Sequence, residues 1–219
     1  MINSIIPMWK PVNLTSFDIV KIIRNQINPV KVGHAGTLDP FAEGLLVLCT
    51  GKKTKSIESL MNEEKEYTAN LILGTETDTL DPTGGIIKTA DVPTLTTQSI
   101  LGVLSNFIGN IMQQPPMYSA LKVNGQRLYK LARQGITVHR NKRKIMIYDI
   151  QLLDFTINTI KIHVKCGRGT YIRSLARDIA LNLGTVGHLK SLKRTRIGNV
   201  DKKACITIKE FPKWLSARI

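Results

Sequence analysis

Several residue types and motifs are scarce in this 219-residue chain, and each scarcity narrows what the protein can be. Only three cysteines occur, at positions 49, 166 and 205, and none has the CxxC spacing of zinc or redox sites. Cys49 and Cys166 lie in apolar runs, so we expect buried thiols in a reducing compartment. No apolar run approaches the roughly 18 residues of a membrane span, and the N-terminus lacks the pattern of a secretory signal. These absences predict a soluble, cytoplasmic protein.

Acidic residues are also in the minority: 16 Asp and Glu stand against 31 Lys and Arg, for a net charge of +15. Such an excess suggests a polyanionic partner, because Lys and Arg displace counterions from phosphates. A basic protein from a basic proteome is the alternative. The cations gather in two groups: Arg133, Arg140, Lys142, Arg143 and Lys144; and Lys190, Lys193, Arg194 and Arg196. Each group is either a solvated face or an RNA contact.

Motifs of nucleotide hydrolysis and serine catalysis are missing. The run Gly51-Lys52-Lys53-Thr54 resembles a phosphate loop only superficially, since Gly44 and Gly51 are separated by six residues instead of four. No GxSxG elbow occurs, and the four histidines, at 34, 139, 163 and 188, lack the helical spacing of metal ligands. No metal site is expected.

The chain does contain clear helical and strand patterns. Thr15 and Asp18 resemble a capping box, and apolar residues at helical spacing follow as far as Ile27. Side chains alternate between apolar and polar over 65–73 and 159–166, which predicts strands. Further expected elements are strands over 5–9, 45–50 and 144–148, helices over 52–61, 100–108, 126–133 and 172–183, and a polar loop over 74–85. With no repeat or linker, one α+β domain with a mixed sheet flanked by helices is expected.

The most distinctive stretch covers residues 32–46, where a polar, glycine-rich segment runs into an apolar one. Its glycines allow sharp turns or close approach to a ligand, and Pro40 favours an extended Asp39. Such a segment can hold the Asp39 carboxylate on a rigid loop at the edge of a sheet. An ordinary connection with a solvated Asp is the alternative.

Arg173 and Tyr67 are further candidates for chemistry. Arg173 lies in the first turn of a predicted helix, where a cation opposes the macrodipole, so an anion is expected to hold it. A buried Asp39 carboxylate would need such a cation to stay ionised, whereas simple contact of Arg173 with solvent is the other interpretation. Tyr67 begins a strand with its ring on the apolar face. A core position is the default interpretation, and stacking on a nucleobase is the alternative.

The chain closely resembles the bacterial tRNA pseudouridine synthase B (TruB) family in the run Gly33-His34-Ala35-Gly36-Thr37-Leu38-Asp39-Pro40 and the following Ala42-x-Gly44-Leu45-Leu46. In that family the Asp of this motif is catalytic. Other segments also match: Lys10-Pro11, Lys65-x-Tyr67, Thr77-Asp78-Thr79, Met117-Tyr118-Ser119-Ala120, Tyr129-x-x-Ala132-Arg133, Tyr171-Ile172-Arg173 and Leu189-x-x-Leu192-x-Arg194. The resemblance covers roughly residues 5 to 200 of the chain.

The resemblance implies isomerisation of uridine to pseudouridine at position 55, in the T-loop of tRNA, without a cofactor. It implies a target base flipped into a pocket, with Asp39, Tyr67 and Arg173 as the catalytic residues. Arg173 would pair with Asp39 and keep it ionised, while Tyr67 would stack on the base and accept the C5 proton. Substrate contacts are implied for His34, Lys10, Tyr171, Leu192, Arg133 and Arg194.

The resemblance also implies the pseudouridine synthase catalytic fold: α+β, with a mixed, mainly antiparallel sheet flanked by helices. We expect a single catalytic domain over 1–219 with an insertion at about 112–145 that binds the T-loop. Family members commonly carry a C-terminal RNA-binding domain of the PUA type, and too few residues follow Arg196 to form a full one. A monomer that acts on the T-arm of tRNA, without a membrane, is expected.

Two other classes of function remain open. A non-catalytic RNA-binding protein would account for the charge alone, and Asp39 would then be dispensable. A metal-dependent hydrolase would use Asp39, Asp78 and Asp81, and would be inactivated by a chelator.

Overall fold

Two units make up the chain in the computed structural model, which describes residues 2–123 and 125–218. Unit 1 comprises residues 1–68 and 192–219, and unit 2 comprises residues 69–191. The strands β4 (Lys65–Leu73) and β12 (Gly187–Ile197) contribute residues to both units. A single catalytic domain over 1–219 stays a prediction, and positions 1, 124 and 219 of that range lie outside the described residues.

Unit 1 is built on a small sheet in which β3 is central. Strand β3 pairs antiparallel with β1 and β2, and parallel with β12. The elements of unit 1 besides β4 and β12 are β1 (Ile5–Lys10), α1 (Ser16–Ile27), β2 (Val32–His34), β3 (Glu43–Thr50), a 3-10 helix η1 (Gly51–Ser56), α2 (Ile57–Asn62), β13 (Val200–Asp201), a 3-10 helix η2 (Lys202–Ala204) and α6 (Phe211–Ser216). One parallel pair among antiparallel ones makes this sheet mixed.

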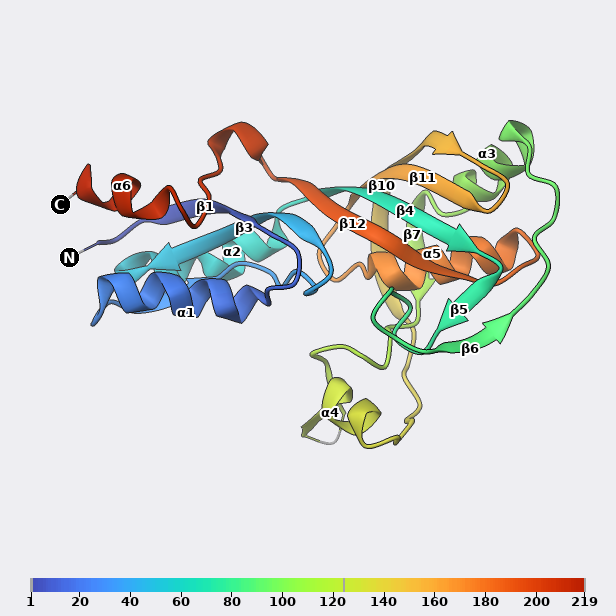
Figure 1. Ribbon diagram of the computed structural model, residues 1–219, viewed down its shortest axis with the longest axis horizontal. Helices are drawn as coiled ribbons and strands as arrows, with labels where there is room; N and C mark the ends of the chain where they lie inside the picture. The colour runs from blue at the N-terminus through green and yellow to red at the C-terminus, as the bar shows by residue number, and fades with distance from the viewer. Residues whose placement is uncertain (1, 124, 219) are drawn as a thin grey trace. The chain divides into compact units, whose positions relative to one another are not determined.

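Helix α1 begins where the sequence predicts. The Thr15 hydroxyl accepts a hydrogen bond from the Asp18 backbone N–H, and the Asp18 carboxylate accepts one from the Thr15 N–H, which completes the capping box. The buried face of α1, Ile19, Val20 and Ile23, packs against β1 and β3 (Figure 1). Each such fully buried aliphatic side chain contributes about 1.5–3 kcal/mol, so this layer anchors β1 and β3, the second of which begins within the glycine-rich stretch.

Unit 2 contains a strand series in the order β4-β11-β10-β7, and the pairs β10–β11 and β10–β7 are antiparallel. Its further elements are β5 (Thr75–Thr77), β6 (Ile86–Thr89), α3 (Thr97–Ser105), β7 (Gly109–Gln113), β8 (Lys122–Val123), β9 (Gln126–Arg127), α4 (Leu128–Arg133), β10 (Arg143–Phe155), β11 (Thr159–Cys166) and α5 (Ile172–Asn182). The predicted alternation of β11 is confirmed, since Ile160, Ile162 and Val164 are all fully buried. The predicted apolar face of α5 is also buried, through Leu175, Ala176 and Ile179.

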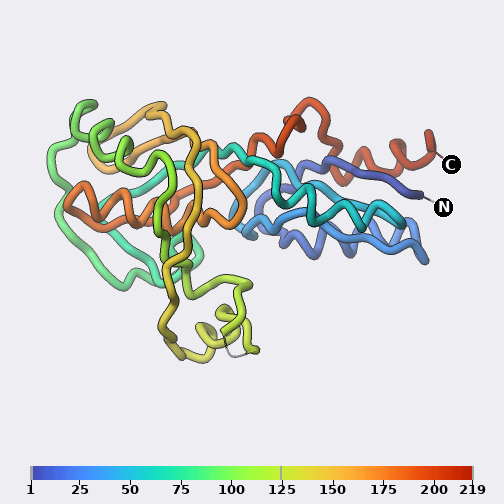
Figure 2. The backbone as a smooth tube through the Cα atoms, turned by 180° about the vertical axis from the view of Figure 1, so that it is seen from behind, coloured from blue at the N-terminus to red at the C-terminus, as the bar shows by residue number. Residues whose placement is uncertain are grey.

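The segment between β7 and β10 leaves the strands of unit 2 and returns to them, and α4 lies at its far end (Figure 2). Its own small core consists of Met117, Leu128 and Leu131, with Tyr118 and Val138 packed around them. The two ends of the segment are joined, because Arg140 Nη1 donates to the Pro115 carbonyl and Gln114 Nε2 donates to the Arg140 carbonyl. We call residues 114–142 the insertion, since they lie between these strands and within the expected range of about 112–145.

Several sequence-based boundaries were wrong. The expected helix over 52–61 is 3-10 helix as far as Ser56, because the N–H groups of Gly51 and Lys52 bond to Lys31 and Asn3 and fix its first turn. The expected helix over 126–133 begins only at Leu128, after the short strand β9. Helix α3 ends at Ser105, so the exposed Ile108 is not part of it.

The expected polar loop over 74–85 is the most consequential error, since it contains β5 and much of it is buried. Thr77, Thr79 and Asp81 are each less than 8% exposed. Their hydrogen-bonding groups are satisfied by one another, which lets a polar sequence occupy an interior position. Cys49 and Cys166 are both buried, as predicted. Among the described residues, no helix combines the length and apolar character needed to cross a bilayer.

Candidate active site

The loop that carries Asp39 is fastened to unit 1 through its own backbone. The Ser16 hydroxyl accepts from the Leu38 N–H at 2.8 Å and donates to the Leu38 carbonyl at 3.1 Å. The Ala42 N–H donates to the Asp39 carbonyl at 3.1 Å and closes a turn. Asp39 is half-buried within this turn. The rigid loop that the sequence predicts is therefore present.

Lys10 supports the loop from one side. It is fully buried at the end of β1, and its Nζ donates to the carbonyls of Pro11, Leu14 and Pro40 at 2.8, 2.7 and 3.4 Å. Burial lowers the pKa of Lys10 to about 8, and the negative charge of Asp39 opposes that shift. Three acceptors match the three N–H groups of the protonated amine, so the charged form fixes the loop best.

Arg194 supports the same loop from β12. Its guanidinium is buried, and Nε donates to the Leu45 carbonyl at 2.7 Å. Its Nη2 donates to the Gly36 carbonyl at 3.2 Å and its Nη1 to the Thr37 carbonyl at 3.4 Å. Lys10 and Arg194 thus hold the carbonyl groups on both sides of Leu38 and Asp39. Both residues were expected to contact substrate, and that contact stays a prediction; in the structure they donate to carbonyls of this loop and, for Lys10, of Pro11 and Leu14 as well.

Gly44 explains why the loop needs glycine at its exit. It pairs with Lys10 on β1 and with Arg194 on β12, so the three backbones meet at one point. A Cβ atom built on Gly44 would lie 2.3 Å from the Arg194 carbonyl oxygen, and the φ angle of +124° is unfavourable for other residues. A larger side chain there would displace β12 and the guanidinium that holds the loop.

His34 ends β2, directly before the loop. It is half-buried, and its Nδ1 has no hydrogen-bond partner among the described residues. Burial and the nearby Arg194 charge lower the pKa of His34, against a backbone hydrogen bond with Gly36. The imidazole is therefore neutral near pH 7, and its buried Nδ1 has a hydrogen-bonding capacity that the described residues leave unused.

Tyr67 and Leu192 are also in unit 1. Tyr67 is 8% exposed and Leu192 is 5% exposed, so both side chains are mostly removed from solvent. The alternation of β4 puts Tyr67 on the buried face, as the sequence predicts. Six of the nine expected site residues, Asp39, Tyr67, His34, Lys10, Leu192 and Arg194, thus belong to unit 1.

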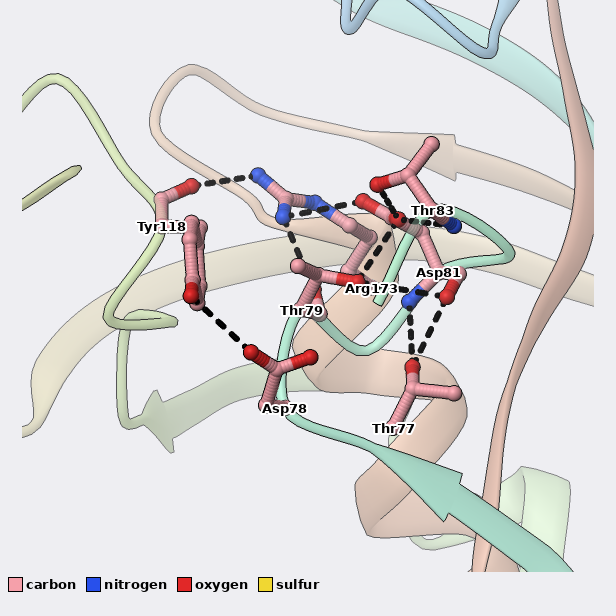
Figure 3. A network of polar contacts seen from close by, with 7 residues as sticks. All are labelled: Thr77, Asp78, Thr79, Asp81, Thr83, Tyr118 and Arg173. Carbon is pink, nitrogen blue, oxygen red and sulfur yellow. Dashed lines mark hydrogen bonds and ion pairs between the residues drawn. The ribbon is translucent and has the colours of Figure 1, made fainter. Parts of the chain in front are cut away.

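Arg173 lies in unit 2, and the structure identifies an anionic partner for it there. In the first turn of α5 it is 5% exposed, and its Nη1 forms an ion pair with Asp81 at 3.2 Å (Figure 3). The same Nη1 donates to the Thr79 carbonyl at 2.8 Å, and Nη2 donates to the Tyr118 carbonyl at 2.7 Å. The expectation that an anion holds this cation is confirmed. The specific pair between Arg173 and Asp39 stays a prediction.

Asp81 is the centre of a dense network around Arg173. Its Oδ1 accepts from the Thr79 hydroxyl at 2.8 Å and from the Thr83 N–H and hydroxyl at 3.0 and 2.5 Å. Its own backbone bonds to the Thr77 hydroxyl (Figure 3). The contacts of Thr79 and Thr83 with the Asp81 side chain each place a donor on a carboxylate oxygen.

Leu80, between Thr79 and Asp81, has a φ angle of +61°. A branched residue in this left-handed conformation costs on the order of 1–3 kcal/mol and persists only where its surroundings impose it. Here its N–H donates to the Thr77 carbonyl at 3.0 Å, and its carbonyl accepts from Leu189 at 3.1 Å. The strained turn at Leu80 directs the Thr79 carbonyl and the Asp81 carboxylate towards Arg173.

Tyr171 caps the start of α5 and is held by a residue that the sequence analysis missed. The buried Gln113 side chain accepts from the Tyr171 N–H at 2.9 Å and donates to its carbonyl at 3.1 Å. Ser174 donates to the Gln114 carbonyl at 2.8 Å. These hydrogen bonds attach the end of β7 to the first turn of α5, which carries Arg173. Nothing in the sequence around Gln113 predicts this attachment.

Comparisons with known proteins identify the family of this chain. Residues 24–172 match the model of the TruB family pseudouridylate synthase N-terminal domain, and residues 173–217 match that of the tRNA pseudouridylate synthase B C-terminal domain. This chain belongs to the TruB family of pseudouridylate synthases. The predicted membership is therefore confirmed, and with it an isomerase of this enzyme class.

Two curated relatives carry the name tRNA pseudouridine synthase B. The one from Clostridium tetani is 44% identical over 95% of this chain and 72% of its own length. The one from Francisella tularensis subsp. tularensis is 48% identical over 90% of this chain and 66% of its own length. A solved structure titled "Crystal Structure of a Cbf5-Nop10-Gar1 Complex" has a TM-score of 0.74 and 30% identity over 98% of this chain and 56% of its own. The predicted α+β fold with a mixed sheet is confirmed.

The two basic groups of this TruB-family chain differ in their surroundings. In the second group, Arg194 is buried, Lys193 pairs with Glu43 at 2.7 Å, and Arg196 lies 3.5 Å from Glu66. In the first group, Arg133, Lys142, Arg143 and Lys144 are exposed. Arg133 lies over the Tyr129 ring at 5.6 Å on the insertion. The first group therefore offers more charge to a partner than the second.

The described residues contain no group of three or more His, Cys, Asp or Glu side chains arranged to hold a metal ion. Of the three carboxylates that a metal-dependent hydrolase would use, Asp81 is bound to Arg173 and the threonines, and Asp78 accepts from the Tyr118 hydroxyl at 2.9 Å. Each of these two carboxylates therefore serves the protein's own network.

Proposed function

We propose that this TruB-family chain converts uridine to pseudouridine in tRNA, at position 55 of the T-loop, with Asp39 as the catalytic carboxylate. The observation that carries the proposal is the Asp39 loop, whose carbonyls are held by Lys10 on one side and Arg194 on the other. A carboxylate on a loop fixed by two buried cations suits attack on a positioned nucleotide, since little reorganisation is then needed.

The reaction is an isomerisation and needs no net oxidant or reductant. The bond between N1 of uracil and C1′ of ribose breaks, and a bond between C5 and C1′ forms. The C5 proton leaves, and N1 of the rotated base ends protonated. Asp39 acts either at C1′ or at C6, and both routes use an ionised carboxylate in contact with the flipped nucleotide.

The other expected residues receive their roles from the resemblance to the family. Tyr67 stacks on the base and accepts the C5 proton, and Arg173, which Asp81 holds within unit 2, belongs to the catalytic set. The neutral His34 fills the space beside the extruded nucleotide, and Leu192 packs against the base. Tyr171 and Arg133 contact the RNA from unit 2. Lys10 and Arg194 act on the substrate through the loop that they hold.

The test is incubation of the purified chain with an unmodified tRNA transcript, followed by carbodiimide labelling and primer extension to locate pseudouridine. We expect one stop, at position 55, with wild type and none with Asp39→Asn, while tRNA affinity and the unfolding transition stay nearly unchanged. Asp91→Asn is the matched control, because Asp91 is exposed on a loop of unit 2.

The same assay separates the alternatives. Tight RNA binding by wild type without any carbodiimide stop would identify a non-catalytic RNA-binding protein. Strand breakage abolished by a chelator would identify a metal-dependent hydrolase. A T-arm stem-loop modified about as fast as whole tRNA would support recognition of the T-arm alone.

A further inference from the structure

The guanidinium of Arg173 is held from two directions by different parts of unit 2. The loop after β5 supplies the Thr79 carbonyl and the Asp81 carboxylate to Nη1. The insertion supplies the Tyr118 carbonyl to Nη2, at 2.7 Å. Acceptors on both Nη atoms hold a guanidinium at two separate points, and the Tyr118 carbonyl is the acceptor that the insertion supplies. The position of Tyr118 therefore contributes to the orientation of Arg173.

Tyr118 is itself tied to the loop that holds the other side of Arg173. Its hydroxyl donates to the Asp78 carboxylate at 2.9 Å, and Asp78 is the covalent neighbour of Thr79 (Figure 3). The contacts close a ring that runs from Arg173 to Tyr118, on to Asp78 and Thr79, and back to Arg173. In Figure 3 the Tyr118 side chain points along one edge of this ring, towards Asp78.

Tyr118 also belongs mechanically to the insertion. It packs on the small core of Met117, Leu128 and Leu131. The next residue, Ser119, accepts from the N–H of Tyr129 at 3.1 Å, in the first turn of α4. A displacement of α4 is therefore passed to the Tyr118 backbone, and through its carbonyl to Nη2 of Arg173.

We propose that Tyr118 is a positioning residue that couples the insertion to Arg173, so that the position of the insertion, on which RNA docks, contributes to the orientation of the guanidinium. The inference rests on the proposed function, since it assigns Arg173 to the reaction and the insertion to RNA binding. Tyr118 acts through Arg173 and needs no contact with the reacting atoms. The Asp78 carboxylate is also part of the coupling, because it accepts the hydrogen bond that holds the Tyr118 side chain.

Three substitutions isolate the coupling. Tyr118→Phe removes only the hydroxyl, and Asp78→Ala removes its acceptor. Asp78→Asn keeps a carbonyl oxygen that can accept from the hydroxyl, so it should restore most of the function. Tyr148→Phe is the matched control: Tyr148 is 44% exposed on β10, outside both the insertion and the loop after β5.

The measurement is single-turnover conversion of a T-arm RNA over a range of enzyme concentrations, which separates the rate constant from the apparent affinity. We expect Tyr118→Phe and Asp78→Ala each to lower the rate constant about threefold to tenfold, because each variant loses one hydrogen bond. The apparent affinity for the RNA should stay within about twofold of the wild-type value. The double variant should match the single ones. In an Arg173→Lys background neither substitution should lower the rate further.

A second measurement does not depend on turnover. The 15N resonances of the Arg173 Nη groups, assigned by their absence in Arg173→Lys, report hindered rotation of the guanidinium in the RNA-free protein. We expect them to be resolved in wild type and Tyr148→Phe, and to broaden or merge in Tyr118→Phe and Asp78→Ala.

Unchanged Nη resonances in Tyr118→Phe would overturn the coupling, whether or not the chain is active. So would a wild-type rate constant in that variant, or a loss of affinity with the rate constant retained, which would make the contact part of the RNA grip alone. A wild-type chain that forms no pseudouridine would refute the proposed function instead, and the resonances would still decide whether Tyr118 orients Arg173.

Discussion

Arg173 and Asp81 form an ion pair at 3.2 Å in the interior of unit 2, with side chains that are 5% and 6% exposed. A charged pair in such a position is stable only when its remaining hydrogen-bonding groups are also satisfied. The threonines around Asp81 bond to its Oδ1, and the carbonyls of Thr79 and Tyr118 accept from the two Nη atoms of Arg173. The ion pair thus holds the planar guanidinium of Arg173 in one orientation, whereas the guanidinium of a solvent-exposed arginine would rotate.

Asp81→Asn should impair both stability and turnover. In wild type, Thr79, Thr83 and Arg173 donate to the two carboxylate oxygens of Asp81. The Asn amide offers them only one oxygen, and its NH2 group must face one of these donors. Removing one partner of a buried ion pair costs about 3–5 kcal/mol in unfolding free energy. We expect the rate constant to fall and tRNA affinity to stay close to wild type, measured by urea unfolding, single-turnover kinetics and filter binding.

Thr83→Val serves as the control for Asp81→Asn, because it removes one donor to Asp81 and leaves the ion pair in place. It should lose stability without a comparable loss of rate. Equal losses of rate in both variants would show that the carboxylate matters through the packing of the loop and not through Arg173.

Much of the fold was predictable because its signals are local. The Thr15 and Asp18 capping box, the alternation of β4 and β11, and the apolar face of α5 are each encoded within one element. The errors occurred where distant groups decide the local structure. Residues 74–85 are polar in sequence but partly buried, because Asp81 and its threonines satisfy one another and Arg173.

The sequence allowed most candidate site residues to be named, but it did not predict which groups they contact. Position in the first turn of α5 predicted that an anion holds Arg173, yet spacing could not indicate that Asp81, 92 residues away, meets Nη1. Lys10 and Arg194 donate to carbonyls of the Asp39 loop, an arrangement that only the meeting of β1, β3 and β12 creates, and their predicted contact with substrate stays a prediction. Gln113 was missed for the same reason, and Tyr118 was named only as part of a segment that matches the family.

Tyr67 offers a test of the proton acceptor. Tyr67→Phe keeps the aromatic face and removes the hydroxyl, in a side chain that is 8% exposed. If the hydroxyl takes the C5 proton, the variant should bind RNA like wild type and turn over at least about a hundredfold more slowly. Tyr67→Leu should also weaken RNA binding, because it removes the stacking face. A fully active Phe variant would restrict Tyr67 to stacking.

From the lowered pKa of Lys10 we expect stability to rise and activity to fall as the pH is raised. Burial holds the pKa of Lys10 at about 8 in the folded chain, below the ordinary 10.5. The unfolded chain therefore binds this proton more tightly, and unfolding free energy should rise with pH, by about 1 kcal/mol between pH 7 and 9. The rate constant should fall over the same range, because a neutral amine has too few N–H groups for the three carbonyls.

The comparison with Lys10→Met isolates this residue, since other groups also titrate. The difference in unfolding free energy between wild type and variant, from urea titrations, should carry the pH dependence. Parallel single-turnover rates should show the alkaline decline in wild type only. A rate and a stability that rise together in wild type would contradict the role of the charged amine in holding the loop.

Arg133 tests whether the exposed cations of the insertion meet phosphate. Each phosphate neutralised by a cation steepens the fall of log affinity with log salt by about 0.7–0.9. Arg133→Gln should therefore reduce the magnitude of that slope by nearly one unit, weaken tRNA binding, and leave the rate constant at saturation unchanged. The control is Lys161→Gln, which removes an exposed cation from β11. Binding titrations at four salt concentrations give both slopes, and equal slopes for wild type and Arg133→Gln would remove Arg133 from the RNA interface.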